Sequence, residues 1–553
     1  MHFKKYIFTI LFLVSFYVYS QSSQKLNIGL ETIMQYYVDD PVTGNFNGTN
    51  RFRSNNYFKF DYNVSKFSFG LQLESYYPQA LLNYSPHLDK KIGIGTYYAA
   101  YKNKKLAVTL GYYYEQFGSG LILRNWEDRQ LGINNALRGI RLKYYPTNKL
   151  NFTILYGQQR VGFKVSEGQI FGFDTNFDAS SEQISLLMGL SYVGRYQNFK
   201  PLYTIDADHN RDFNPLTSAI SGRINIAQGH IYANLEGVWK SKDNLVELGN
   251  IIGNKAFYGN ALQLEAGYSK KGFGFTTTFR RLENMTFYAD RQANGNTYNE
   301  LIINYLPALT RQQDYSLANI YVYSAQAKLS FNPLNKAGEI GYQTDIYYKI
   351  QKKTFLGGKY GTKVALNISN WYGLAADFLT PYKRINTKFL AFGKAYFKDF
   401  TLEVRKKLNK NNKMIYTFIH SYYNKAMVEE THGEVKSNVV AAEWSHKFTG
   451  YKSMRAELQH LWTKEDKGNW AAALAEFNFN THLGIFMGDM YNYGNPDENH
   501  QNHYYNFGGS YTKNGNRYAV SYGRQREGLL CVGGVCRVVS AATGFTFSAN
   551  ISF

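Results

Sequence analysis

The chain has 553 residues, 17% of them aromatic, and 62 basic against 41 acidic side chains give it a formal net charge of +21. Its content of 49 Tyr and 39 Phe is high for a soluble enzyme. Beyond the N-terminal stretch no run of about 18 apolar residues occurs, which excludes a bundle of transmembrane helices. The composition and residue pattern are uniform from about residue 25 onward, so residues 21–553 are predicted to form one domain.

Residues 1–20 are predicted to be a signal peptide. Lys4 and Lys5 precede an apolar stretch that ends near Val18, and cleavage is expected after Ser20. This order of charge, apolar run and small residue is that of a secretory signal. A retained membrane anchor is the alternative, and the shortness of the apolar run disfavours it. Export removes nucleic acid as a partner for the positive charge.

Strands that alternate apolar and polar side chains recur along the chain, for example over residues 231–239, 399–405 and 454–463. Such a strand lies between two unlike media. In a soluble sandwich the charged face meets water outside, whereas in a membrane barrel it meets water inside and the apolar face meets lipid. The predicted lumen-lining residues are Glu236, Asp399, Glu403, Arg405, Glu443, Arg455 and Glu457.

The connections decide between these folds, because short turns alternate with long polar stretches. Short turns are expected near 63–66, 102–105, 146–149, 227–229, 269–272, 409–413 and 513–516. Long loops are expected near 39–54, 79–91, 117–135, 161–181, 241–259, 283–316, 425–435, 492–503 and 526–537. This sorting predicts an all-β, transmembrane antiparallel β-barrel with long extracellular loops and short periplasmic turns.

The strand number depends on two weak strands, near Leu202–Ile205 and near Leu374–Leu379. Both termini on the periplasmic side require an even number. About 26 strands are therefore predicted, with about 24 as the second choice.

Among the long loops, the stretch 117–139 brings together the most side chains that could act chemically. If it folds inward, as a third loop often does in general porins, opposed charges would narrow the pore. The candidate constriction residues are Arg124, Glu127, Asp128, Arg129 and Arg138. The positive surplus would then give a slight preference for anions. The alternative is a surface loop held by ordinary ion pairs.

Two further patterns bear on chemistry. Asp497, Glu498, His500 and His503 lie close enough in sequence to hold a divalent metal, although a flexible polar loop has the same composition. The sequence has no G-x-S-x-G, no H-E-x-x-H and no phosphate loop. We therefore expect no enzymatic activity and no cofactor.

The stretch "CVGGVC" predicts a disulfide between Cys531 and Cys536. A turn at Gly533-Gly534 places the two thiols opposite each other across a hairpin, in a pair whose Cα atoms approach closely. An exported protein permits the bond. A metal site would need two more ligands nearby, and none is present. The hairpin is expected to be extracellular.

The chain ends on the alternating stretch "GFTFSANISF". Its apolar row is expected to face lipid on a last strand that closes the barrel against the first. A terminal aromatic residue on such a strand looks like the signal by which barrel-assembly machinery recognises its clients. The candidate signal residues are Phe545, Phe547, Ile551 and Phe553.

Three stretches resemble a family of barrels, without an assigned activity, from the outer membranes of Bacteroidota. They are "FGSGLILRNWEDRQLGINNALRG" (117–139), "NYLPALTRQQDYSLA" (304–318) and "YNYGNPDENHQNHYYN" (491–506). A signal peptide that ends in Ser-Gln is typical of that phylum. The resemblance covers most of the mature chain, and it implies location in a Gram-negative outer membrane and the barrel fold, with no activity to carry over.

Two functions from different classes remain open. The first is a passive or loop-gated pore for small solutes. The second is a non-enzymatic partner barrel in a larger outer-membrane complex for protein secretion, barrel assembly or surface-lipoprotein docking. The expected partners are outer-membrane lipids, the assembly machinery during insertion and, for the second function, outer-membrane proteins or lipoproteins. The pore is favoured because large barrels leave a lumen.

Overall fold

Antiparallel strands make up most of the chain that the computed structural model describes, namely residues 24–198, 214–247, 250–291, 300–327, 336–379, 384–431 and 433–553. The signal peptide predicted at 1–20 lies outside these residues. In the described part of the chain, no helix is long and apolar enough to cross a membrane.

The first half of the wall consists of β1 (Gln24–Val38), β2 (Phe52–Val64), β3 (Phe67–Ser75), β4 (Ile92–Lys102), β5 (Leu106–Tyr113), β10 (Leu137–Thr147), β11 (Leu150–Val161), β12 (Lys164–Asp178), β13 (Ser185–Tyr196), β14 (Leu216–Gln228), β15 (Ile231–Glu247) and β16 (Asn250–Lys270). The second half consists of β17 (Phe273–Glu283), β18 (Gly338–Ile350), β19 (Thr362–Leu379), β20 (Arg384–Lys407), β21 (Asn412–Asn424), β22 (Glu434–Lys447), β23 (Ser453–Trp462), β24 (Trp470–Asn478), β25 (Leu483–Tyr491), β26 (Asn506–Lys513), β27 (Asn516–Gln525) and β30 (Ala542–Ser552).

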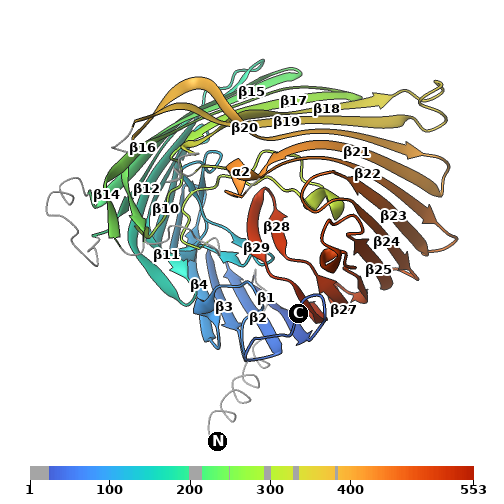
Figure 1. The fold of residues 1–553 in the computed structure, drawn as a ribbon. Coiled ribbons are helices and arrows are strands. Elements are labelled where there is room, and N and C mark those ends of the chain that lie inside the picture. Colours follow the sequence, from blue (N-terminus) through green and yellow to red (C-terminus); the bar gives the residue numbers. More distant parts are fainter. Residues whose placement is uncertain are drawn as a thin grey trace, which may run out of the picture.

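These strands form one closed antiparallel barrel of 24 strands, counted over the described residues (Figure 1). Each strand pairs with the next, β5 with β10, β27 with β30, and β30 with β1. The first-choice prediction of 26 strands is wrong and the second choice is correct. The weak strand expected near Leu374–Leu379 is the end of β19, and the one expected near Leu202–Ile205 lies outside the described residues.

Alternation places the two faces of each strand in different surroundings. On β23, Leu458 is 66% exposed on the outside of the barrel, whereas its neighbour Glu457 is 4% exposed. Outward aromatic and aliphatic side chains recur in this way around the wall. They form the apolar outer surface of an outer-membrane barrel, which meets lipid.

The seam between the two ends of the chain is fully paired. Ten residue pairs join β1 and β30, and Tyr36 lies opposite Phe545 while Met34 lies opposite Phe547. The predicted closure of the last strand against the first is confirmed. Phe545 is half exposed on the outer face, and the Phe553 side chain is 74% exposed.

The long connections lie on the opposite side of the barrel from the termini. Two expected loops are wrong: most of 161–181 is β12, and most of 241–259 belongs to β15 and β16, which pair as far as Asp243 and Phe257. These strands are longer than expected. They were mistaken for loops because the polar residues on them resemble the composition of a loop.

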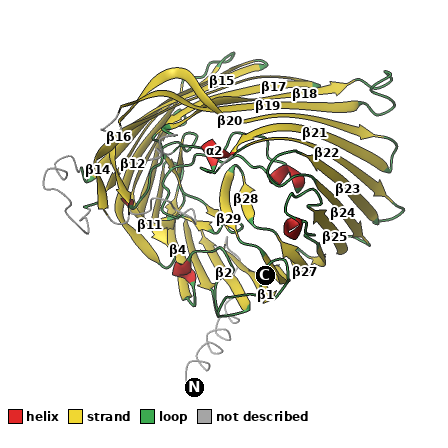
Figure 2. Ribbon diagram, viewed as in Figure 1, coloured by secondary structure: helices red, strands yellow, loops and turns green. Residues whose placement is uncertain are grey.

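Several connections carry short elements of their own. They are β6 (Gln116–Phe117), β7 (Leu123–Arg124), β8 (Glu127–Asp128), β9 (Ile133–Asn134), β28 (Gly528–Val532), β29 (Val535–Val539), α2 (Lys425–Val428) and the 3₁₀ helices η1 (Pro86–Leu88), η3 (Leu317–Asn319) and η4 (Glu498–His500). Figures 1 and 2 show the β28–β29 hairpin inside the ring of strands. The barrel therefore encloses part of its own connections.

Replacing Phe553 with Asp is expected to lower the amount of folded barrel in the outer membrane. The Phe553 N–H donates to the Ile28 carbonyl at 2.9 Å, so the backbone pairing of β30 continues to this residue. Alternation then places its side chain in the outward row of β30. A carboxylate there would meet the lipid interface, where charge is less favourable than an aromatic ring. Heat-modifiable protein on gels of membrane fractions measures the change.

The matched control is Ser552→Asp, which introduces the same charge on the inward-facing row of the same strand. Normal levels of folded Phe553→Asp protein would show that the last aromatic residue is dispensable.

Candidate functional site

The lumen holds a first inner segment, residues 114–136, which joins β5 to β10. Its apolar side chains Phe117, Leu121 and Ile122 are at most 1% exposed. They pack against inward-facing wall residues, among them Leu155 and Val193. Apolar side chains leave water only where a second apolar surface receives them, so this segment and the wall form a hydrophobic core inside the barrel.

A second inner segment, residues 284–291 and 300–327, joins β17 to β18 and crosses the lumen. Leu317 and Tyr323 are each 1% exposed and belong to a core with the wall residues Trp371 and Trp470. The Trp371 indole donates to the Leu309 carbonyl at 2.9 Å, and the Leu317 N–H donates to Gln459 at 2.9 Å. The wall therefore holds this segment by both packing and hydrogen bonds.

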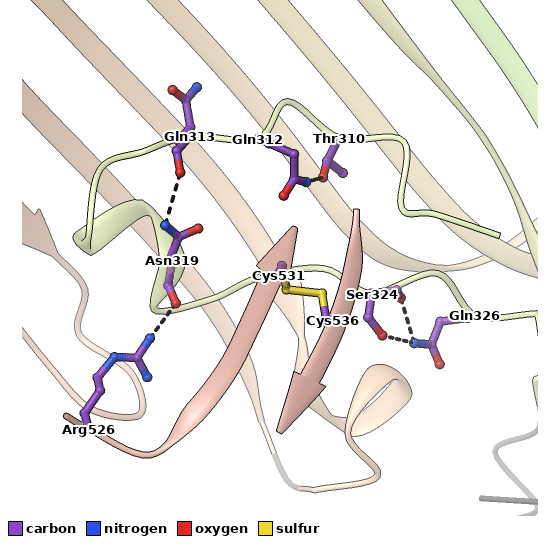
Figure 3. The surroundings of a disulfide bond; sticks show 9 residues. All are labelled: Thr310, Gln312, Gln313, Asn319, Ser324, Gln326, Arg526, Cys531 and Cys536. Carbon is purple, nitrogen blue, oxygen red and sulfur yellow. Dashed lines mark hydrogen bonds between the residues drawn. A yellow bond between two sulfur atoms is a disulfide. The ribbon is translucent and has the colours of Figure 1, made fainter. Parts of the chain in front are cut away.

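A third inner segment, residues 526–541, contains the β28–β29 hairpin. Figure 3 shows the disulfide between Cys531 and Cys536 beside the second inner segment. The hairpin was expected to be extracellular, and in the structure it is folded into the barrel. The Ala308 N–H donates to the Gly534 carbonyl at 2.8 Å, and the Tyr305 hydroxyl donates to the Gly533 carbonyl at 2.8 Å.

The second inner segment is the one that joins the other two. The Arg124 N–H donates to the Ile303 carbonyl at 2.9 Å, and the Tyr305 N–H donates to the Gly120 carbonyl at 2.9 Å. The Asn304 amide donates to the Leu121 carbonyl at 3.0 Å. Because one segment bonds to both of its neighbours, the three form a single plug, a name used below for residues 114–136, 284–291, 300–327 and 526–541.

A buried ion pair fixes the plug to the wall. Arg280 on β17 donates to Glu339 on β18 at 2.8 Å, and both side chains are at most 1% exposed. Arg280 also donates to the Pro307 carbonyl at 2.6 Å, while Glu339 accepts from the Tyr323 hydroxyl and from the Gln326 N–H. Three groups of the plug therefore bond to one buried charge pair of the wall.

The predicted constriction residues lie in the plug, with one exception. Arg124 lies over the rings of Trp126 and Tyr305, 5.0 and 3.8 Å from their centroids, a cation–π arrangement. Arg129 forms ion pairs with Glu31 of β1 and with Glu127. These contacts tie the first inner segment to itself and to the wall.

The remaining two candidates behave differently. Asp128 accepts from the Leu131 N–H at 2.8 Å and thereby closes a turn. Arg138 is exposed on β10 in the row that carries the outward-facing Ile140 and Tyr144. Its assignment to the constriction is wrong, because strand alternation begins at Leu137 and puts Arg138 on the outer face.

The carboxylate of Glu127 is held in its charged form. Burial acts to raise its pKa, but the neighbouring Arg129 and Lys59 outweigh burial and lower this pKa below its usual value. Arg129 lies 3.3 Å and Lys59 3.8 Å from the carboxylate. A charged Glu127 keeps its ion pair with Arg129 at neutral pH.

The predicted lumen-lining residues all lie on the inward face of the wall, but the plug covers several of them. Glu236 accepts from the Ser119 N–H of the plug at 2.9 Å, and Glu403 pairs with Arg311 of the plug at 3.0 Å. Asp399 and Glu457 are buried as well. These residues anchor the plug as much as they line water.

A mixed charge patch continues along the inward face. Arg405 pairs with Glu403. Arg455 contacts three carboxylates, Glu443 at 3.0 Å, Glu476 at 3.3 Å and Glu457. The patch spans β20 to β24.

The histidine-rich stretch at 491–506 is divided between two contacts. His500 bonds to Asp497 at 2.8 Å, and His503 bonds to Asp489 at 2.6 Å and stacks on Tyr491. Over the residues described, no three His, Cys, Asp or Glu side chains gather in a way that could hold a metal ion.

Sequence reasoning missed the residues that fix the plug, above all Arg280 and Glu339. They are separated by 59 positions in the sequence, and nothing local pairs them. One signal was available in the sequence. Glu339 lies between an alanine-glycine pair and an apolar residue at the start of a strand, where a charged side chain is expected to be buried and therefore to need a hydrogen-bonding partner.

A family model matches residues 3–553 of the chain, and it describes a family of unknown function, DUF6029. The chain belongs to this family. The match confirms the resemblance of residues 117–139, 304–318 and 491–506 to a barrel family without an assigned activity.

No curated protein matches this DUF6029 member. Among solved structures it is similar to the translocation pore of the P pilus usher PapC, with 9% identity, a TM-score of 0.42, and coverage of 95% of this chain and 99% of that chain. It is also similar to OccK11 (OpdR) of Pseudomonas aeruginosa, with 9% identity, a TM-score of 0.35, and coverage of 80% of this chain and 97% of that chain. For the copper transporter OprC the identity is 8%, the TM-score is 0.40, and the coverage is 96% of this chain and 80% of that chain. The similarity concerns the fold alone.

Mass spectrometry without reductant is expected to find Cys531 linked to Cys536 in protein from the native host. Replacing both with Ser should change stability little, because the closed loop is short and because Tyr305 and Ala308 still hold the hairpin. Two free thiols in the native protein would contradict the expectation.

Replacing Glu339 with Gln is expected to destabilise the DUF6029 barrel by about 3–5 kcal/mol, because the Arg280 charge then stays buried without its partner. Thermal unfolding, followed by gel mobility or circular dichroism, measures the loss. The matched control is Glu476→Gln, in a pair whose side chains are 29% and 41% exposed, for which at most about 1 kcal/mol is expected. Equal losses in both variants would show that the buried pair has no special weight.

Proposed function

We propose that this protein is a loop-gated outer-membrane pore for small solutes, and that the plug is the gate. One observation carries the proposal: the 24-strand wall encloses a plug made of connections from one side of the barrel. A barrel of this size surrounds a wide lumen unless something fills it. The plug fills part of that lumen, and on this proposal it moves to let solutes pass.

The composition of the plug supports movement as a unit. Its three segments bond to one another through Arg124, Tyr305 and Ala308. Its link to the wall at Glu403 is a single ion pair with Arg311 that can break and reform, whereas its bonds to the buried pair of Arg280 and Glu339 hold one end of the plug in place. The expected passive open pore is the less favoured form of the proposal, since the lumen contains two hydrophobic cores.

The inward face between β20 and β24 bears on ion preference. Its carboxylates outnumber the guanidinium groups that contact them, because Asp399, Glu403, Glu443, Glu457 and Glu476 face Arg311, Arg405 and Arg455. The same inward rows also carry Lys407, Lys413 and Lys447, so the face is mixed in charge. The slight anion preference expected from the net charge of the whole chain stays a prediction.

Single-channel recording tests the proposal on a variant in which residues 120–132 are replaced by a short Gly-Ser link. The replacement removes Leu121 and Ile122 from the inner core and the bond from Arg124 to Ile303. Larger conductance than wild type, with weakened ion preference, is expected.

Two controls sharpen the recording. Replacing residues 352–356, an exposed turn between β18 and β19, by the same link should leave conductance unchanged. Joining Ser316→Cys to Gln459→Cys with a short bismaleimide should hold the plug to the wall and abolish conductance, since these side chains lie 3.2 Å apart. If wild type and the 120–132 variant are both silent, the pore proposal fails.

A partner barrel is the second candidate, and an apolar groove on the outer face favours it. The groove has a volume of about 520 Å³ and is lined by Phe477, Ile485, Met487, Phe507 and Val520 among others. It would receive apolar groups of another outer-membrane protein or lipoprotein. Reproducible partners after mild-detergent purification at native expression support this candidate, whereas a lone conducting barrel supports the pore.

The proposed location is the outer membrane of a Gram-negative bacterium of the Bacteroidota, reached through a signal peptide cleaved after Ser20. The apolar outer surface of the barrel supports the membrane, and the N-terminal sequence supports export. The proposal includes no catalytic role and no cofactor. It includes the barrel-assembly machinery as a transient partner that recognises Phe553.

A further inference from the structure

A cavity of about 620 Å³ lies between the third inner segment and the wall of the barrel. The hairpin contributes Leu529, Leu530 and Arg537, and the wall contributes residues of β1, β27 and β30, including Tyr37 and Thr546. The volume falls in the range of about 300–1,000 Å³ that is usual for small-molecule sites. The cavity is therefore large enough for a ligand of many atoms.

The lining of this cavity contains three arginines, whose charges are compensated to different extents. Arg524 donates to the buried carboxylate of Asp40 at 2.8 and 3.1 Å, so its charge is neutralised. Arg526 donates only to carbonyl oxygens, that of Asn319 at 2.6 Å (Figure 3) and that of Glu527 at 2.8 Å. A carbonyl accepts a hydrogen bond but does not neutralise a cation.

Arg537 is also without a counter-charge. It donates to the Asn83 carbonyl at 2.8 Å and lies 4.5 Å from the centre of the Tyr84 ring. Its side chain is buried, with the residue 8% exposed, and its Nε has no hydrogen-bond partner. Among the described residues, no carboxylate lies within 4.0 Å of Arg526 or Arg537.

Buried guanidinium groups without counter-charges are unfavourable. Arg526 is partly exposed, and burial lowers its pKa, an effect that the neighbouring Tyr504 and Glu527 only partly oppose. Glu527 is the one acidic residue in the cavity lining, and it is exposed. An anion in the cavity would supply the missing charge, and a guanidinium group matches the geometry of a carboxylate or phosphate.

The rest of the lining indicates what the anion carries. Apolar and aromatic side chains share the lining with a similar number of polar ones, and they include Ile33, Leu81, Met490 and Tyr504. We propose that this cavity binds a small organic anion, with its carboxylate or phosphate on the guanidinium groups of Arg526 and Arg537 and its apolar or aromatic body against the tyrosines and leucines. The site does not depend on whether the barrel conducts.

Isothermal titration of the full protein in lipid nanodiscs tests the proposal. The probes are phenyl phosphate and phenylacetate, and the neutral comparison is benzyl alcohol, which keeps the ring without the charge. Saturable binding of at least one anion, about tenfold tighter than that of benzyl alcohol, is expected, because a hydrogen bond to a charged group is worth about 1.5–3 kcal/mol. The better of the two anions tells phosphate from carboxylate.

Variants locate the site. Arg526→Gln and Arg537→Gln should each weaken anion binding about tenfold or more, and Arg526→Lys should retain part of it. The matched control is Arg51→Gln, which removes an arginine that pairs with Asp39 outside the cavity and should leave binding unchanged. Equal binding of anion and alcohol by wild-type protein, no saturable binding, or equal weakening by Arg51→Gln would each overturn the proposal.

Discussion

Every backbone N–H and C=O group that lies in lipid needs a partner within the protein, because the hydrocarbon offers none. For strands this requirement can be met only by a closed sheet. The seam between β1 and β30 meets it here with an unbroken ladder. Closure at 24 strands then sets the circumference, and the circumference sets the space that the connections have to fill.

The interior shows how the chain uses that space. Wall positions near the long connections carry apolar residues such as Leu155, Val193 and Trp470 facing inward, where a water-filled pore would carry polar ones. The plug covers them, and the buried pair of Arg280 and Glu339 fixes its place. Farther along, charged residues such as Arg455 remain partly exposed. The lumen of this barrel thus has one part filled by packed side chains and another part lined by water-accessible charges.

The wall was predictable from the sequence, whereas of the plug only the inward folding of 117–139 was anticipated, as one of two alternatives. Alternation with a period of two placed Glu236 and Glu457 on the inward face and Phe545 outward, since the parity of a strand is a local property. Arg138 was misplaced because it was counted with the loop stretch 117–139, whereas β10 begins at Leu137. The plug depends on contacts such as Asn304 to Leu121, 183 positions apart, and no local period reports them.

The order of assembly is constrained by the same seam. Gln35 of β1 contacts Thr546 of β30 across 511 positions of the chain, so the first strand has no partner on one edge until the last strand arrives. A closed wall cannot admit a segment through its side, and pairing across such a separation is slow. The inner segments must therefore be in place, or enter through the open end, when β30 docks. The disulfide hairpin directly precedes β30 in the chain, so it is the inner segment with the least time to take its place before closure.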